Sequence, residues 1–577
     1  MDLRVQRTIG SRTSWIVTFF LMGAVVLWAA LQARWLGLHK AFSIDEFQYA
    51  HAAWLVSHGQ VPYRDFFEVH FPLVYLLLSP VFWWAGDDPL AILKLRAIMV
   101  GFALIGAVAA ARLNREVSRL AAVATALFVL LSPSLISFLI EIRPDSLGAV
   151  LLVVALALLR LRRRPFLAGV GAGLAAVGCA FSTQKAAFYG VVLLIPVAAN
   201  VFELRRGEAL VKRRCLGTVA GALAGTTAVA LYLFLSGAAP AFWQWCFVWA
   251  AEHERHYSDF PATKYLAGVV QRDVPLLLFA AVGLGGTLRD LASARIRAVL
   301  HEDFPLVAAA LSTFASIVLQ RAPFPYSFAG FLIILAVFGG RGVGILGRSL
   351  WAQGRTARTG VVLGAIAGLI WMGAALSQAT SRSNGDQLKV LAQVARLTGP
   401  DMPVYDNSGG YVARPHVRYL FYTDALLRRT HAAELTRDVP SELIRSGCVV
   451  HLRDLRFDGL PPALKAFLSA HYQPYDGDLF LWGMRIPLHE GTGDLEFIAP
   501  RAGRYFVSDE GNPAHANLTV DGAPADPRGF ELPAGTHSIH YEGGSGEAYV
   551  LWLPRNGETW RPHRGAPRFS LLFGHAT

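Results

Sequence analysis

Long apolar runs follow one another over the first two-thirds of the chain, separated by short polar connections. An apolar helix of about 20 residues is long enough to cross the hydrocarbon core of a bilayer. The pattern therefore predicts a polytopic α-helical membrane protein with about eleven transmembrane helices. The expected spans are 14–36, 95–112, 119–139, 146–161, 165–181, 186–203, 215–236, 273–288, 304–320, 326–340 and 359–378.

A twelfth apolar run, residues 71–85, is shorter than these spans and contains Pro72 and Pro80. Counting it as a span would reverse every later helix and place the arginine groups, such as residues 162–164, outside the cell. Lys and Arg concentrate in cytoplasmic loops, so we expect a juxtamembrane or re-entrant segment instead. This segment lies in a first outer loop of residues 37–94, and the N-terminus is then cytoplasmic.

The pattern changes after the last expected span. Residues 380–490 mix amphipathic helical and short strand patterns, which predicts a small α/β domain. From about residue 491, apolar and polar residues alternate between Gly and Pro turns, which predicts a β-sandwich-like domain over residues 491–577. Both domains are expected on the extracytoplasmic side, attached to a membrane domain of residues 1–379.

Composition agrees with a membrane protein, because 54% of the 577 residues are hydrophobic and only 16% are charged. The net charge of +12 could suggest a nucleic-acid partner. The basic residues, however, sit in short groups between apolar runs, as in cytoplasmic loops, so no nucleic-acid partner is expected. The cysteines at 179, 215, 246 and 448 lack metal-ligand spacing. A Cys246–Cys448 disulfide and free thiols both remain open.

The first outer loop carries an unusual set of acids beside the expected membrane surface. Charged groups near hydrocarbon are costly and often mark a substrate or ion site. Asp45 could deprotonate an acceptor hydroxyl or hold a divalent metal ion, whereas Ser43 or Asp45 could instead cap a helix. The candidate site residues of this loop are Asp45, Glu46, Arg64, Asp65, Glu68 and His70.

Later connections on the same expected face carry further charged residues. The sequence EIRPDSLG contains Glu141, Arg143 and Asp145. Arg143 could bind a phosphate with its planar fork, and Asp145 could ligate a metal ion or organise a phosphate site. Lys185 in FSTQK and Arg321 in QRAPFPYSF could also neutralise a phosphate. A helix cap with an Arg–Asp pair and a snorkelling lysine are the structural alternatives.

Two sets of glycines favour packing over chemistry. Gly342, Gly344 and Gly347 match G-x-G-x-x-G, but a dinucleotide site requires a preceding strand, and here an apolar span precedes the motif. The glycines at 169, 171 and 173 lie inside a span, where small residues let helices approach closely. We therefore predict no dinucleotide site.

The first loop resembles that of the GT-C membrane glycosyltransferases of the protein-mannosyltransferase and aminoarabinose-transferase type. The resemblance rests on the Asp-Glu pair at 45–46, on GQVPYRDFFEVHFPL after it, and on Arg-Pro-Asp at 143–145. It implies a sugar donor carried on polyprenyl phosphate and used at the periplasmic face of a bacterial inner membrane. It also implies that Asp45 is the catalytic acid, and that Asp145 matches an acid that helps to hold a divalent metal in some relatives.

This sequence also departs from the family pattern. His70 stands where aminoarabinose-type relatives carry a lysine, and Phe71 replaces the first proline of their Pro-Pro-Leu motif. The departure argues against aminoarabinose as the sugar.

The predicted function is an integral membrane glycosyltransferase in which an aspartate general base promotes inverting attack on the donor. Asp45 and Glu46 are the catalytic candidates. The acceptor is expected to be an extracytoplasmic lipid, glycan or protein, and no cofactor beyond a divalent metal ion is expected. The donor-phosphate candidates are Arg143, Lys185, Arg321, His70 and Arg64, the metal candidates are Asp45 and Asp145, and the other site residues are Asp65, Glu68 and Glu141.

Three other functions are compatible with the same sequence. They are a lipid-linked glycan transporter or flippase, an O-antigen-type polymerase or ligase, and a non-catalytic scaffold for the outer domains. A transporter should carry polar residues along its spans, at the depth of the bilayer centre. The expected spans are almost uncharged, which favours the transferase.

Overall fold

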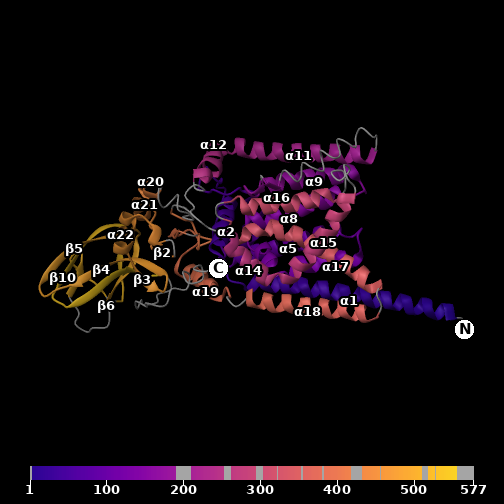
Figure 1. Cartoon of the computed structure of the whole chain (residues 1–577). Coiled ribbons are helices and arrows are strands. Elements are labelled where there is room, and N and C mark those ends of the chain that lie inside the picture. The colour runs from indigo at the N-terminus through magenta and orange to yellow at the C-terminus, as the bar shows by residue number, and fades with distance from the viewer. Residues whose placement is uncertain are drawn as a thin grey trace.

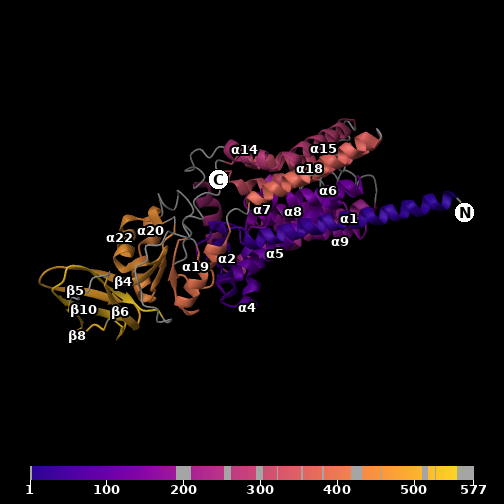
Figure 2. The same cartoon turned by 90° about the horizontal axis from the view of Figure 1, so that it is seen from below.

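The computed structural model describes residues 3–186, 188–189, 209–252, 262–293, 303–320, 323–352, 355–379, 383–407, 409–417, 432–454, 457–509, 517–526 and 528–554. Figures 1 and 2 show two regions arranged end to end: a helical bundle and a smaller region of strands and short helices. The helix α2 lies where the two regions meet (Figure 1).

The bundle has helices where the apolar runs predicted them. They are α1 (Leu3–His39), α5 (Ala91–Leu113), α6 (Arg119–Leu131), α7 (Pro133–Leu139), α8 (Pro144–Leu159), α9 (Pro165–Ala180), α11 (Ala209–Leu235), α15 (Val274–Ser293), α16 (Phe304–Val318), α17 (Ala329–Ala352) and α18 (Arg355–Ala379). Within the described ranges, four helices are long and apolar enough to cross a membrane, and the bent pair α6–α7 makes a fifth. The protein is therefore a multi-pass membrane protein. The count of eleven spans stays a prediction, and the expected span 186–203 falls almost wholly outside the described residues.

A proline explains the break in the span predicted over 119–139. Pro133 begins α7, and Ser132 before it adopts an extended conformation with φ −64° and ψ 114°. A residue that precedes proline is pushed out of the helical region by the proline ring. The two helices consequently meet at an angle of 69°.

Glycines set the closest helix contacts inside the bundle. A Cβ atom on Gly283 of α15 would collide with the Phe338 carbonyl of α17, and one on Gly342 would collide with the Phe279 carbonyl of α15. A Cβ atom on Gly344 would lie 3.0 Å from Cβ of Ala121 in α6. The G-x-G-x-x-G sequence is therefore part of a helix-packing surface of α17.

The helices α9 and α11 are joined in the same manner. A Cβ atom on Gly169 or Gly173 of α9 would collide with the backbone of α11. A Cβ atom on Gly217 or Gly221 of α11 would collide with the backbone of α9. Small residues at this spacing allow two membrane helices to approach until their backbones touch. Figure 1 shows α11 lying alongside α9 at the outside of the bundle.

An ionic network largely shielded from solvent joins several helices at the C-terminal end of α8. Asp303, directly before α16, accepts hydrogen bonds from Arg160 (2.7 Å) and Arg341 (2.6 Å). Arg341 also donates to Asn114 and Thr287. Arg341 is buried, so its charge requires these partners.

The first loop forms short helices between the bundle and the second region. These are α2 (Ile44–Ser57), α3 (Leu73–Leu78), a 3₁₀ turn (Ser79–Val81) and α4 (Phe82–Ala85). At 1.5 Å per residue the segment 73–85 extends about 20 Å, which is less than the thickness of the hydrocarbon core. The juxtamembrane or re-entrant placement of this segment stays a prediction.

The second region contains two sheets and several helices. Its elements are α19 (Gly385–Leu397), β1 (Val404–Tyr405), α20 (Ala432–Thr436), α21 (Val439–Arg445), β2 (Val450–Leu452), α22 (Pro462–His471), β3 (Tyr472–Asp476), β4 (Leu479–Leu488), β5 (Thr492–Ala499), β6 (Gly503–Asp509), β7 (Asn517–Val520), β8 (Ala523–Pro524), β9 (Phe530–Leu532), β10 (Gly535–Glu542) and β11 (Gly546–Trp552). One sheet has the order β1-β2-β4-β11-β6-β9, with β3 beside β4, and the other has the order β5-β10-β7-β8.

Strand β4 crosses the line between the two predicted outer domains. Its first half pairs with β2 and β3, and its second half pairs with β11, from beyond residue 490. The α/β and β parts consequently share one sheet and one hydrophobic core. All four cysteines are free and buried, so Cys246 and Cys448 form no disulfide.

Candidate functional site

The two adjacent acids of the first loop lie at the start of α2. Ser43 precedes the helix, and its backbone N–H donates to the Glu46 carboxylate at 3.0 Å. This contact is half of a capping box, which fixes the direction in which the helix begins. Asp45 and Glu46 therefore project from the same helical turn, but they have different surroundings.

Glu46 is fully buried against Arg96 of α5. The guanidinium donates to both carboxylate oxygens, at 2.7 and 2.6 Å, and neither side chain has exposed surface. Arg96 also donates to the carbonyl groups of Gly37, Lys40 and Ala41 at the end of α1. This arrangement fixes the turn between α1 and α2, and so it orients the helix that carries Asp45.

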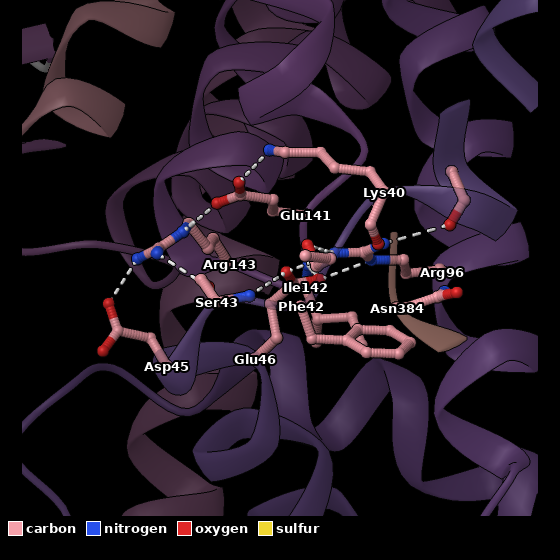
Figure 3. A network of polar contacts seen from close by, with 12 residues as sticks. Lys40, Phe42, Ser43, Asp45, Glu46, Arg96, Glu141, Ile142, Arg143 and Asn384 are labelled. Carbon is pink, nitrogen blue, oxygen red and sulfur yellow. Dashed lines mark hydrogen bonds and ion pairs between the residues drawn. The ribbon is translucent and has the colours of Figure 1, made fainter. Parts of the chain in front are cut away.

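Asp45 points instead toward Arg143, as Figure 3 shows. Arg143 lies before α8 and donates to three oxygens: Oδ2 of Asp45 at 2.6 Å, Oε2 of Glu141 at 2.5 Å and Oγ of Ser43 at 2.9 Å. The Arg143 side chain is 6% exposed, whereas that of Asp45 is 17% exposed. Of the two adjacent acids, Asp45 is thus the one within reach of a substrate.

Lys40 completes a chain of four charged groups. It donates to Oε1 of Glu141 and to the Ser137 carbonyl. Burial alone would raise the pKa of Glu141, but the positive charges of Lys40 and Arg143 outweigh it and lower this pKa to about 2. Glu141 is therefore ionised at neutral pH, and the order of the chain is Lys40, Glu141, Arg143 and Asp45.

A second ion pair lies beside this chain. Lys185 donates to Asp145 at 2.7 Å, and its ammonium lies 4.6 Å from the ring centre of Tyr326. The Arg143 guanidinium lies 4.1 Å from the centre of the same ring. Cations are attracted to aromatic faces at such distances. Tyr326 therefore brings together two cations from separate loops.

Glu68 and His70 form a neighbouring network. Glu68 is fully buried and accepts hydrogen bonds from the Gln48 side chain, from the backbone of residues 69 and 70, and from Nδ1 of His70 at 2.8 Å. The ring of His70 meets the Tyr49 ring edge-on at 5.3 Å. Burial raises the pKa of Tyr49, and the charges of Asp45 and Glu68 raise it further.

Other candidates from the sequence lie elsewhere. Arg64 pairs with Asp65 at 2.7 Å and donates to the Ser236 carbonyl, and both side chains are largely solvated. Their described contacts do not reach Arg143. Arg321 lies outside the described residues.

The structure does not assemble the metal candidates into a site. Asp45 pairs with Arg143, and Asp145 pairs with Lys185. In the part of the chain that the structure describes, no three or more His, Cys, Asp or Glu side chains gather as metal ligands. In this arrangement, both acids are held by cations.

Three contributors escaped prediction from the sequence. Arg96 and Lys40 stand at the ends of apolar runs, where basic residues are ordinarily interfacial anchors. Tyr326 lies in a loop selected for its arginine, and a lone tyrosine gives no signal of its own. The one available indication of Arg96 was its place just inside the expected span 95–112.

Comparison with known proteins gives a likeness of fold. No family model and no curated protein matches the sequence. The structure resembles the crystal structure of ArnT from Cupriavidus metallidurans in the apo state. The match covers 82% of this chain and 98% of the ArnT chain, with a TM-score of 0.55 and 16% sequence identity. This chain therefore has the same fold as that structure.

Two further solved structures show the same likeness of fold. ArnT from Cupriavidus metallidurans bound to undecaprenyl phosphate covers 82% of this chain and 98% of its own, with a TM-score of 0.54 and 15% identity. The apo oligosaccharyltransferase of Archaeoglobus fulgidus covers 79% of this chain and 73% of its own, with a TM-score of 0.50 and 13% identity. At these identities the likeness concerns the fold.

Proposed function

We propose that this GT-C protein transfers a sugar from a polyprenyl-phosphate donor to an extracytoplasmic acceptor. The observation that carries the proposal is the contact between Asp45 and Arg143, beside Lys185 on the shared Tyr326 ring. A partly exposed carboxylate next to two clustered cations suits a reaction that deprotonates one group while a phosphate leaves. The solved ArnT complex contains undecaprenyl phosphate, which supports a donor of this class.

Arg143 and Lys185 are the proposed phosphate ligands. A departing phosphate gains negative charge as its bond to the sugar breaks, and fixed cations stabilise that charge in the transition state. Arg143 donates one hydrogen bond to each of three protein oxygens, and a guanidinium has five N–H donors. Two donors thus remain for a phosphate, and Tyr326 keeps both cations on one side of the site.

Asp45 is the proposed general base. Its carboxylate would take the proton of the acceptor hydroxyl as the acceptor oxygen bonds to the anomeric carbon. The bond from that carbon to the phosphate oxygen breaks on the opposite face, so the anomeric configuration inverts. The products are the glycosylated acceptor and the polyprenyl phosphate.

Glu46 has a different proposed role from Asp45. A carboxylate with no exposed surface and both oxygens on Arg96 is suited to positioning. We infer that Glu46 and Arg96 hold the first turn of α2 at the angle that presents Asp45 to the acceptor. The metal role of Asp45 and Asp145 enters no step, because each carboxylate is paired with a cation.

The location is part of the proposal. The N-terminus would lie in the cytoplasm of a bacterial cell, and the site and both outer domains would face the periplasm across the inner membrane. The positive-inside distribution of arginines supports this orientation. The acceptor would then be an envelope lipid, glycan or protein.

The test is transfer of radiolabelled sugar from a panel of polyprenyl-phosphate sugars to membrane acceptors, with purified wild type and Asp45→Asn. Asp494→Asn is the matched control, because Asp494 is 80% exposed on β5. We expect transfer by the wild type and the control, and a loss of roughly 100-fold or more without the base. Donor binding without transfer by any protein would favour the transporter, and equal transfer by Asp45→Asn would exclude Asp45 as the base.

A further inference from the structure

Lys40 occupies a fixed place between the end of α1 and the start of α2. Its backbone carbonyl accepts a hydrogen bond from Arg96, and its backbone pairs with Ser383 as an isolated β-bridge. Asn384, beside that bridge, donates to the carbonyl groups of His39 and Leu38. The main chain of Lys40 is therefore held from two sides, and Figure 3 shows its side chain extending to Glu141.

The four linked side chains Lys40, Glu141, Arg143 and Asp45 have no net charge only when Lys40 is counted. Asp45 and Glu141 are two carboxylates on the single guanidinium of Arg143. Lys40 supplies the second positive charge through the free oxygen of Glu141. All four side chains are at most 18% exposed, so water screens an imbalance among them only weakly.

We propose that Lys40 is a positioning residue for the donor, which neutralises Glu141 and thereby keeps Arg143 able to bind an incoming phosphate. The inference rests on the proposed function, because it concerns the same donor site. Lys40 itself does not touch the donor. It acts through Glu141 on the guanidinium, so that an anionic donor meets a neutral group of charges instead of a negative one.

Loss of the Lys40 charge would have two effects on the site. The four-residue chain would become net negative, and a phosphate, which carries one or two negative charges, would be repelled. Arg143 would also become the only counter-charge of Glu141, so it would be held more tightly by the protein. Both effects weaken the donor complex, and neither removes the base Asp45.

The first part of the test measures the affinity of purified protein in lipid nanodiscs for undecaprenyl phosphate, the probe. We expect Lys40→Met to weaken binding by roughly tenfold, within the range of coupled neighbouring residues. Lys40→Arg should keep most of the affinity, because it keeps the charge. Lys94→Met is the matched control, since Lys94 is 53% exposed and pairs with Asp88 at the surface. In transfer assays the donor KM of Lys40→Met should rise more than its kcat falls.

The second part separates charge balance from simple structural support. The double variant Lys40→Met/Glu141→Gln has lost one charge of each sign, so it should recover most of the wild-type affinity. A structural tether would not be restored by a second truncation, so a double variant as weak as Lys40→Met would overturn the proposal. Unchanged binding by Lys40→Met would overturn it as well.

Two further outcomes are misfolding of Lys40→Met and a lack of binding by the wild type. If Lys40→Met does not fold, Glu141→Gln alone tests the same count of charges, because it leaves the chain net positive. It should then bind undecaprenyl phosphate more tightly than wild type, and weaker binding would count against the proposal. Absence of binding by the wild type would contradict the proposed function itself, which distinguishes the two failures.

Discussion

Replacement of Glu46 by glutamine should destabilise the protein, because it leaves the buried charge of Arg96 without a counter-charge. Both side chains have 0% exposed surface, and the guanidinium donates to both Glu46 oxygens. Removing one partner of a buried ion pair costs about 3–5 kcal/mol. A glutamine offers one acceptor oxygen where Arg96 donates to two, and its amide group would face another donor, so we expect the upper part of this range.

The assay is thermal unfolding of the purified protein in detergent, followed by intrinsic fluorescence, beside the sugar-transfer rate. We expect Glu46→Gln to lower the unfolding midpoint by several degrees and to reduce transfer, since α2 loses its anchor. Asp45→Asn should abolish transfer with little change in the midpoint, because Arg143 keeps Glu141 and Ser43 as partners. Glu542→Gln, at a side chain 61% exposed, should match wild type in both measurements.

Each of the variants Glu46→Gln and Asp45→Asn has a result that would contradict the role proposed for its residue. If Glu46→Gln unfolded at the wild-type temperature and had no transfer activity, Glu46 would act in the chemistry, and the positioning role would be wrong. If Asp45→Asn lost stability as severely as Glu46→Gln, Asp45 would be another structural ion-pair partner.

Three further predictions concern residues outside the Lys40–Asp45 ion-pair network. Asp303→Asn should destabilise the bundle by about 3–5 kcal/mol in detergent unfolding, because it strips the carboxylate from two arginines. Gly283→Leu should give less folded protein in membranes, measured by fluorescence-detected gel filtration, because its side chain would meet the backbone of α17. Burial and the charge of His416 lower the pKa of His51 from 6.5 to about 3. The unfolded chain therefore takes up this proton first, and stability falls as the pH drops below about 6.5. The unfolding midpoint should decline from pH 7 to pH 5, and it should decline less in His51→Gln.

The positions of the long helices could be predicted from the sequence, because apolar runs separated by arginine groups have few alternative structures. The grouping of Arg143 and Lys185 near Asp45 followed from counting which loops share a face, and the structure places these side chains on one tyrosine ring. Counting the expected spans assigns each loop to one side of the membrane. Only charged residues of loops on the same side can then form one site.

Partners within the site could not be predicted in the same way. Arg96 and Lys40 are basic residues at the ends of apolar runs, and their carboxylate partners lie more than 45 residues away in the chain. The distinct surroundings of Asp45 and Glu46 depend on which distant side chains pack against the first turn of α2, and the residue pattern of that turn does not identify them. The pairing of β4 with β11 across residue 490 was hidden for a related reason, because strand periodicity does not identify the neighbouring strand.

The second region is connected to the site more directly than two separate predicted domains would suggest. The side-chain amide of Gln387 in α19 accepts from the backbone N–H of Phe42 at 2.7 Å and donates to its carbonyl at 2.9 Å. His51 of α2 contacts the Val412 carbonyl at 3.1 Å. The start of the helix that bears Asp45 is thus held by residues that follow α18, which ties the second region to the geometry of the proposed base.

The most direct test of the account is a cryo-electron microscopy structure of the protein in nanodiscs with undecaprenyl phosphate bound. The account predicts the phosphate within hydrogen-bond distance of Arg143 and Lys185, with Asp45 facing the space that the transferred sugar and the acceptor would occupy. A phosphate bound at Arg64, or at the arginine groups at the other end of the bundle, would contradict the proposed site.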